Sequence, residues 1–364
     1  MGRLFIKNIQ ISHFRSHKFS NIDLAEGPIV LCGLNGVGKT NILEAISLFS
    51  PGRGLRRSTA LELRRFPENL GWKVSAKILK LNNVHEVSIS SQETLSRLVE
   101  IDGDKTTQLN LGNIVRMLWI TPFMDRLWLD GATERRRFLD RLVLSVDNSH
   151  GKNSLIYNKA MKQRNRLIKD NINDEVWLGV LEDQMAISGY KIDLARQLAL
   201  QRIVEFQKSF ESGFPVANLK LLNANLGSVD QFRIALEKNR PADFRAGRSL
   251  IGPHKTDLIA IFENKGIEAK YCSTGEQKAL MISIVLASAR IQKADLSTPP
   301  ILLLDEVSAH LDSSRRSLLY EEICSLEAQV LFTGTDLNIF DDLKERAQCF
   351  SVDVSSNETI LVDI

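Results

Sequence analysis

The stretch VLCGLNGVGKTN, residues 30–41, constrains this chain more than any other. Gly33, Gly38, Lys39 and Thr40 complete the pattern G-x-x-x-x-G-K-[ST], in which backbone N–H groups surround phosphate oxygens and the lysine adds a positive charge. The apolar run before the loop predicts a buried strand, and NILEAISLF after it has apolar residues at helical spacing. A strand, this loop and a helix in that order predict an α/β fold with a phosphate site. The residues expected to hold a bound nucleotide are Gly33, Leu34, Asn35, Gly36, Val37, Gly38, Lys39, Thr40 and Asn41.

A second motif, ILLLDE at residues 301–306, predicts a buried parallel strand that ends in two carboxylates. If this strand shares a sheet with the phosphate loop, Asp305 is expected to hold Mg²⁺ together with Thr40. Glu306 would then orient or deprotonate the attacking water. By itself, an acidic pair after an apolar run fits a helix start equally well. The predicted catalytic residues are Lys39, Asp305 and Glu306.

A third motif, STGEQ at residues 273–277, opens a predicted helix just before that strand. Ser273 is a good N-cap, and Gly275 lets another backbone or a phosphate come close. The stretch therefore predicts a second anion site, although an ordinary capped helix explains it as well.

Charge is informative here only where it clusters, because the formal net charge of the 364 residues is +3. Arginines gather in SPGRGLRRSTALELRRF, and a second basic group lies in YNKAMKQRNRLIKD. A solvated face and a DNA-binding face explain both groups. The candidate DNA-binding residues are Arg56, Arg57, Arg64, Arg65, Lys159, Lys162, Arg164 and Arg166.

Changes in residue pattern along the chain indicate its domain organisation. Strand-like segments fill residues 1–132, charged helical segments nearly free of Gly and Pro fill 133–213, and strands return in 214–364. We expect a helical arm inserted between two parts of one ATP-binding head. The charged N-terminus does not fit a signal peptide and no apolar stretch approaches membrane-spanning length, so a cytoplasmic protein with no membrane partner is expected.

The order of these motifs resembles the ATP-binding-cassette ATPases of the chromosome-maintenance (SMC) and Rad50 type. More closely, the chain resembles the RecF family of bacterial recombination mediators. The matching segments include ISHFRSHKF, GLNGVGKTNILEAISLFSPGRGLR, TPFMDRLWLDGATERRRFLDRLV, YNKAMKQRNRLIK, GPHKTDL and STGEQKAL. They cover nearly the whole chain, and several are not general to ATPases.

The resemblance implies an ATPase head of mixed sheets with flanking helices and an inserted helical arm. It further implies an ATP-locked dimer in which Ser273, Gly275 and Gln277 of one chain face the γ-phosphate held by the other. Arg15 would lie near the nucleotide, and Asp312 would communicate across the interface. ATP and Mg²⁺ are the implied cofactors. The implied partners are gapped, single-stranded or duplex DNA, a second copy of the chain, and RecR with RecO and RecA.

Two further functions compete with this interpretation: the nucleotide-binding subunit of a transporter and a short chromosome organiser. Transporter ATPases place a histidine after the strand that follows the acidic pair, whereas this chain has Thr335 in LFTGTD. This difference and the inserted arm favour a slow, DNA-stimulated ATPase that acts as a switch. The arm is too short for the sustained heptads of an organiser.

Overall fold

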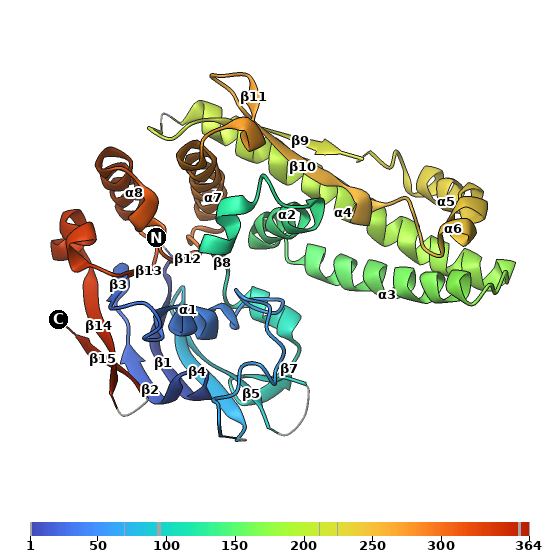
Figure 1. Cartoon of the computed structure of the whole chain (residues 1–364). Helices are drawn as coiled ribbons and strands as arrows, with labels where there is room; N and C mark the ends of the chain where they lie inside the picture. The colour runs from blue at the N-terminus through green and yellow to red at the C-terminus, as the bar shows by residue number, and fades with distance from the viewer. Residues whose placement is uncertain are drawn as a thin grey trace. The chain divides into compact units, whose positions relative to one another are not determined.

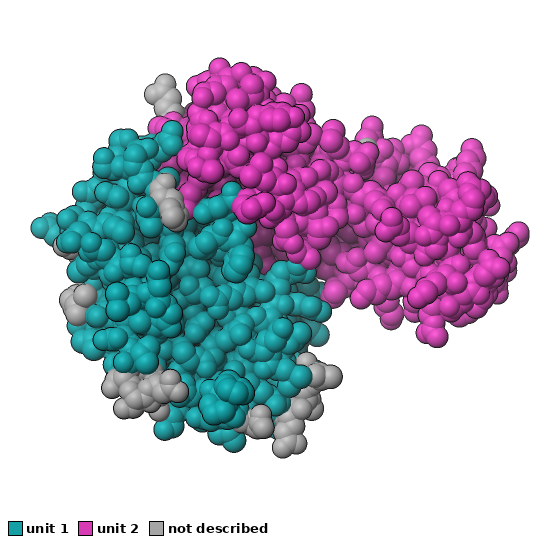
Figure 2. Space-filling view, viewed as in Figure 1, with its two compact units in different colours: residues 1–125, 285–364 teal, residues 126–284 magenta. Residues whose placement is uncertain are grey.

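The computed structural model describes residues 2–68, 70–92, 96–210, 212–223, 225–355 and 358–363. The chain forms two compact units, which Figure 2 distinguishes by colour. The first unit combines Met1–Asp125 with Val285–Ile364, and the second is Arg126–Ile284.

A largely parallel sheet carries the motifs of the first unit, in the strand order β15-β14-β3-β13-β12-β8. Strands β14, β3, β13, β12 and β8 are parallel, and β15 pairs antiparallel with β14. Every residue of β3, β12 and β13 is buried, as expected for strands covered on both faces. The strands are β3 (Pro28–Cys32), β8 (Met117–Ile120), β12 (Ile301–Leu304), β13 (Val330–Gly334), β14 (Gln348–Ser355) and β15 (Glu358–Asp363).

A second, antiparallel sheet of the first unit has the order β2-β1-β4-β5-β6-β7. Its longest strand, β1, buries apolar side chains such as Ile9 and Ile11, which join Ile29 and Leu31 of the parallel sheet in one core. Helix α1 (Lys39–Ser47) contributes Ile42 to the same core. The strands are β1 (Leu4–Phe14), β2 (His17–Asp23), β4 (Trp72–Lys80), β5 (Asn83–Ser91), β6 (Leu98–Ile101) and β7 (Asp104–Thr106).

The second unit is built around the antiparallel helices α3 (Ser149–Lys169) and α4 (Glu175–Ser209), which lie along each other in Figure 1. Their shared core includes Tyr157, Leu178 and Phe232. The unit also holds a sheet in the order β11-β10-β9. No helix among the described residues is long and apolar enough to cross a membrane. The remaining elements are α2 (Ala132–Val146), β9 (Ala217–Leu222), α5 (Val229–Lys238), α6 (Arg240–Ala246), β10 (Asp257–Phe262) and β11 (Ile267–Glu268).

The second unit is longer than the helical arm expected at residues 133–213. The second unit runs on to Ile284, because β9 packs against α4, and β10 packs against α2. Its border with the first unit falls within helix α7 (Thr274–Leu296). The three-stranded sheet therefore belongs with the helices.

A buried ionic network joins α3 to α4 and α6. The Arg164 guanidinium is fully buried and donates to Glu182 Oε1 at 3.0 Å, Asp243 Oδ2 at 2.7 Å and Ser249 Oγ at 2.8 Å. Arg240 contacts the second oxygen of Glu182 at 2.6 Å. This placement corrects the expectation that Arg164 contacts DNA. The guanidinium is buried and is paired with the carboxylates of Glu182 and Asp243.

We expect Arg164→Ala to destabilise the protein by about 3–5 kcal/mol, because it leaves the buried Asp243 carboxylate without its cation. The midpoint of urea unfolding, followed by circular dichroism, measures the loss. Arg166→Ala is the matched control, since the Arg166 side chain is 85% exposed, and it should change stability by less than about 0.5 kcal/mol. Equal effects of the two variants would contradict the structural role of Arg164.

Candidate functional site

The phosphate loop connects the buried strand β3 to the first turn of α1. Gly38 has φ 108°, and a Cβ there would lie 2.5 Å from Thr359 Oγ1. A Cβ on Gly33 would lie 2.1 Å from the carbonyl oxygen of Val352. Both positions therefore require glycine, one for its backbone angle and both for space. The loop is packed from behind by β14 and β15, while the Cβ direction of Gly36 has no atom within 4 Å.

Lys39 lies across this loop with its ammonium group turned inward. Nζ donates to the carbonyl oxygens of Gly33, at 2.5 Å, and Leu34, at 2.8 Å. Burial lowers the pKa of Lys39, while the carboxylate of Glu306 opposes that shift. The positive end of the α1 dipole points at the same loop. The lysine and the helix together favour an anion there, as the sequence predicts.

Asp305 connects the strand β12 to the helix that follows the loop. Its Oδ1 accepts hydrogen bonds from Thr40 Oγ1 at 2.9 Å and from Thr333 Oγ1 at 2.7 Å. The strands β12 and β3 share one sheet, and the structure therefore brings Asp305 and Thr40 together, as expected if the two motifs lie in the same sheet. A hydroxyl beside a carboxylate at a phosphate loop is a donor set that fits Mg²⁺, which takes few protein oxygens and completes its shell with phosphate and water.

Glu306 follows Asp305 in a left-handed backbone conformation, with φ 52°. A non-glycine residue there costs on the order of 1 kcal/mol, and such conformations cluster at functional sites. The Glu306 N–H donates to Thr333 Oγ1 at 2.9 Å, so one hydroxyl orients both acidic residues. Sequence analysis missed Thr333. The signal was available, because a threonine near the end of an otherwise apolar strand is a polar group in a buried position.

Two arginine side chains contact helix α1 through the carboxylate of Glu44. Arg15 donates to both carboxylate oxygens of Glu44, at 3.0 and 2.9 Å, and Glu44 is almost fully buried. Arg56 contacts the same carboxylate at 3.5 Å and donates to Asn41 Oδ1 at 3.1 Å. Arg15 therefore braces the loop helix. Its predicted contact with the nucleotide stays a prediction.

The helix start at Ser273 has the reciprocal hydrogen bonds of a capping box. The N–H and Oγ of Ser273 each donate to Glu276 Oε2 at 3.0 Å, and the Glu276 N–H donates back to Ser273 Oγ at 3.4 Å. Lys265 contacts Glu276 Oε1 at 2.5 Å. Hydrogen bonds from Lys265 and from the Ser273 backbone lower the pKa of Glu276 to about 2. Sequence analysis missed Glu276, which places a carboxylate at the predicted anion site.

Gln277 does not lie where the resemblance implies. Its side chain is buried, and Nε2 donates to the Cys272 carbonyl oxygen at 2.9 Å. The amide therefore fixes the turn before α7 and is not presented to a ligand, which corrects the expected phosphate contact. Ser273 is exposed and Gly275 half-buried.

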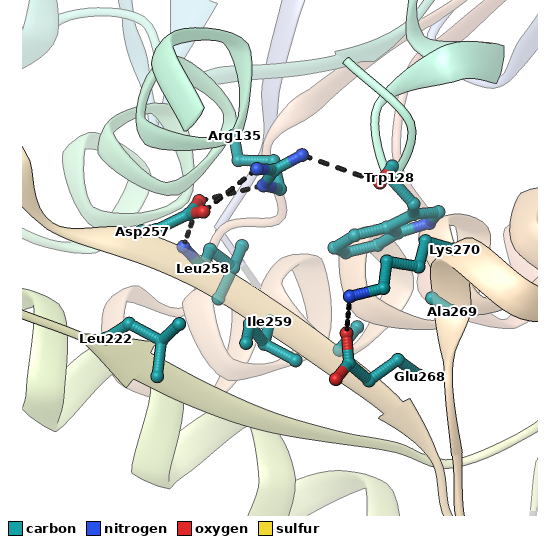
Figure 3. Close-up of a pocket in the computed structure, with 10 residues that line it drawn as sticks. Trp128, Arg135, Leu222, Asp257, Leu258, Ile259, Glu268, Ala269 and Lys270 are labelled. Carbon is teal, nitrogen blue, oxygen red and sulfur yellow. Dashed lines mark hydrogen bonds and ion pairs between the residues drawn. The ribbon is translucent and has the colours of Figure 1, made fainter. Parts of the chain in front are cut away.

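The pocket drawn in Figure 3, of about 150 Å³, lies beside this turn in the second unit. It is lined by Trp128, by residues of β10, and by η4 (Ala269–Tyr271), which leads into Ser273. Figure 3 shows Arg135 pointing at Asp257, and its Nε and Nη2 contact the two carboxylate oxygens at 2.8 and 2.9 Å. Trp128 Nε1 donates to the Gln277 carbonyl oxygen at 3.3 Å. These contacts position the helix start.

The predicted basic clusters divide into buried and exposed members. Arg65 is buried and donates to the Ser16 carbonyl oxygen at 2.6 Å, which corrects its assignment to a DNA surface. Arg57 is exposed, and Arg64 contacts the Gln92 carbonyl oxygen. On α3, four of the exposed cations follow one another along one helix face at spacings of three and four residues. They are Lys159, Lys162, Arg166 and Lys169.

Two further predicted residues lie at element ends in the first unit. Asp312 is the N-cap of α8 (Ser313–Leu326), and Oδ1 accepts from the Arg315 N–H at 2.9 Å. Thr335 is exposed directly after β13, which lies between β3 and β12 in the sheet. Because these strands are parallel, Thr335 follows the same edge as the phosphate loop and Asp305. Its nearness to a γ-phosphate stays a prediction.

The chain is similar to known proteins along most of its length. The chain matches the AAA domain family over residues 8–242. It is 40% identical to the DNA replication and repair protein RecF of Rhizobium rhizogenes, across 96% of this chain and 97% of that protein.

Solved structures confirm the expected fold class, a mixed α/β ATPase head with a helical arm. One is the recombination mediator protein RecF-ATPrS in the RecFOR pathway, with a TM-score of 0.85, 23% identity, and coverage of 99% of this chain and 98% of that one. Another is the Smc head domain of Pyrococcus furiosus with an extended coiled coil. Its TM-score is 0.57 at 16% identity, over 99% of this chain and 96% of that one.

Proposed function

Because the chain belongs to the RecF family of DNA replication and repair proteins, we propose that it is an ATP-dependent DNA-binding protein of recombinational repair and replication-fork maintenance. The observation that carries the proposal is the hydrogen-bonded group of Thr40, Asp305 and Thr333 beside a complete phosphate loop. An ATP-locked dimer binds DNA at gaps and helps to load a recombinase. RecR, with RecO and RecA, are the proposed partners.

The proposed hydrolysis uses residues of the first unit. Lys39 exchanges its two carbonyl contacts for β- and γ-phosphate oxygens, and the loop N–H groups orient the same phosphates. Thr40 and Asp305 would hold Mg²⁺, which would supply charge neutralisation on the phosphates when bound. Glu306, kept beside them by Thr333, accepts a proton from the attacking water. With Thr335 in place of a histidine after β13, turnover is slow and DNA-stimulated, as suits a switch.

The proposed dimer completes each site with a second copy of the chain. The α7 start of that copy, with Ser273 and Gly275, approaches the γ-phosphate held by Lys39. Glu276 must then release its hold on Ser273 or keep its charge paired with Lys265, because a bare carboxylate would repel the phosphate. Asp312 contributes to the same interface.

DNA binding is proposed for the exposed basic faces. The α3 face presents cations at helical spacing. Arg56 and Arg57 are exposed in the segment after α1, and Arg64 in the same segment is half-buried. Cations at such spacing follow a phosphate backbone without reading sequence. Arg56 also contacts the Glu44 carboxylate, so its contribution to DNA binding is smaller than that of the exposed α3 cations.

We expect Lys39→Ala to abolish ATP binding and Glu306→Gln to keep binding while stalling hydrolysis, because only the second variant removes the base and spares the phosphate contacts. Nucleotide binding is measured by equilibrium dialysis with labelled ATP, and hydrolysis by phosphate release. Turnover at the wild-type rate in Glu306→Gln would refute the role given to Glu306.

We expect Ser273→Arg to block ATP-dependent dimerisation and to leave ATP binding intact, because the new side chain fills the surface that meets the second copy. Sedimentation velocity with and without ATP measures the dimer. The matched control is Ser228→Arg at the exposed N-cap of α5, where Ser228 Oγ accepts from the Gln231 N–H at 3.2 Å. If both variants dimerise normally, the composite site is excluded.

Reversing Lys159, Lys162 or Arg166 to Glu should weaken ATP-dependent DNA binding. The slope of log affinity against log salt should flatten by about 0.9 for each lost duplex phosphate contact, with no change in sequence preference. Arg57→Glu tests the first unit in the same way. Binding of labelled gapped, single-stranded and duplex DNA across a salt series measures both quantities.

Lys238→Glu, at an exposed position in the last turn of α5, controls for the change of net charge in this series. Slopes that match this control in every variant, with dimerisation intact, would place the DNA path elsewhere.

A further inference from the structure

Helix α4, labelled in Figure 1, carries an exposed apolar stripe along most of its length. The exposed fraction is 79% at Val176 and 48% at Ile187, and five aliphatic residues of the stripe are exposed in all. Isolated exposed aliphatic residues are common, but a continuous row on one helix indicates an interaction surface. The members of this α4 stripe are Val176, Val180, Ile187, Leu194 and Leu198.

The spacing of the stripe is symmetric about Ile187. Val180 and Leu194 lie seven residues to either side, and Val176 and Leu198 lie eleven residues to either side. Eleven residues are almost a whole number of helical turns, so the row runs nearly straight along the helix for roughly 33 Å.

The charges on this face are also symmetric, but opposite in sign. Asp183 lies four residues before Ile187, and Lys191 lies four residues after it. Both side chains are exposed, and Asp183 has a long contact of 3.8 Å to Arg233. In an antiparallel pair, every position before the centre meets the equivalent position after it on the other helix. Such a pair would therefore match apolar with apolar and acid with base.

We propose that the α4 stripe pairs with the α4 stripe of a second copy of this chain, antiparallel about a two-fold axis at Ile187. Val180 then meets Leu194 of the second copy, Val176 meets its Leu198, and Asp183 meets its Lys191. The pairing is independent of nucleotide, and it goes beyond the ATP-dependent dimer proposed above.

The area of this surface limits the affinity of the pairing. A contact roughly 33 Å long and about 10 Å wide covers about 330 Å² of each helix, well below the area of a stable interface. The free chain is therefore mostly monomeric, and the α4 pair is a weak contact that a covalent cross-link can trap. Other faces of α4 contact α2, α3, α5 and β9, whereas this row is exposed.

Engineered cysteines test the antiparallel alignment without ATP or DNA. Ile187→Cys should cross-link to itself on mild oxidation, because the two copies meet at this residue. Val180→Cys and Leu194→Cys should each fail alone, since identical residues would be roughly 21 Å apart along the helices, but should cross-link when mixed. The wild-type chain measures the background from Cys32, Cys272, Cys324 and Cys349, of which Cys324 alone is not buried.

Charge exchange tests the same register independently. On the mixed Val180→Cys and Leu194→Cys chains, Asp183→Lys should slow cross-linking severalfold, because it places two lysines together. Adding Lys191→Asp to the same chains should restore the rate. Circular dichroism confirms that each variant folds.

Self-linking of Val180→Cys, or Ile187→Cys yields at the wild-type background, would overturn the antiparallel pairing. Because no arm of the test contains ATP, such a failure leaves the proposed ATP-dependent dimer untouched. Loss of that dimer in Ser273→Arg would likewise leave the α4 cross-links unchanged.

Discussion

The hydroxyl–carboxylate contacts at Asp305 are the interaction on which the rest of the candidate site depends. One carboxylate oxygen accepts from Thr40, on the helix after the phosphate loop, and from Thr333, on the neighbouring strand. Three segments far apart in the sequence are thereby held at one edge of a parallel sheet. The same Thr333 hydroxyl accepts from the Glu306 backbone, so the acid proposed to bind Mg²⁺ and the acid proposed to act on water share one hydrogen-bond partner.

Positive charge serves two purposes in this protein, and burial separates them. Arg164 and Arg65 are enclosed and paired, and removing such a cation leaves a carboxylate or a carbonyl without its partner. Lys159 and Arg166, on the same helix as Arg164, face solvent and are the ones available to an anionic polymer. Neighbouring residues of one type therefore differ in role, because a helix turns each of them in a different direction.

The helix start at Ser273 has a structural role as a capping box, and its contact with phosphate is proposed. Its capping box stabilises α7, and Lys265 neutralises the carboxylate that forms the box. A phosphate at the same helix end would compete with Glu276 for the N–H groups of the first turn. This competition is compatible with the proposed site, which would engage nucleotide only when a second copy is present.

Sequence alone determined the parts of this protein that depend on local chemistry. The phosphate loop, the acidic strand end and the helix start at Ser273 are read from short motifs, because backbone angle, apolar pattern and capping are local properties. Only the tertiary structure decided which side chains are enclosed. It buried Arg164, Arg65 and Gln277, brought Thr333 to Asp305, joined the β9–β11 sheet to the helical arm, and left one apolar row of α4 uncovered. Burial depends on which distant segments of the chain pack against a residue, and a local sequence pattern does not contain that information.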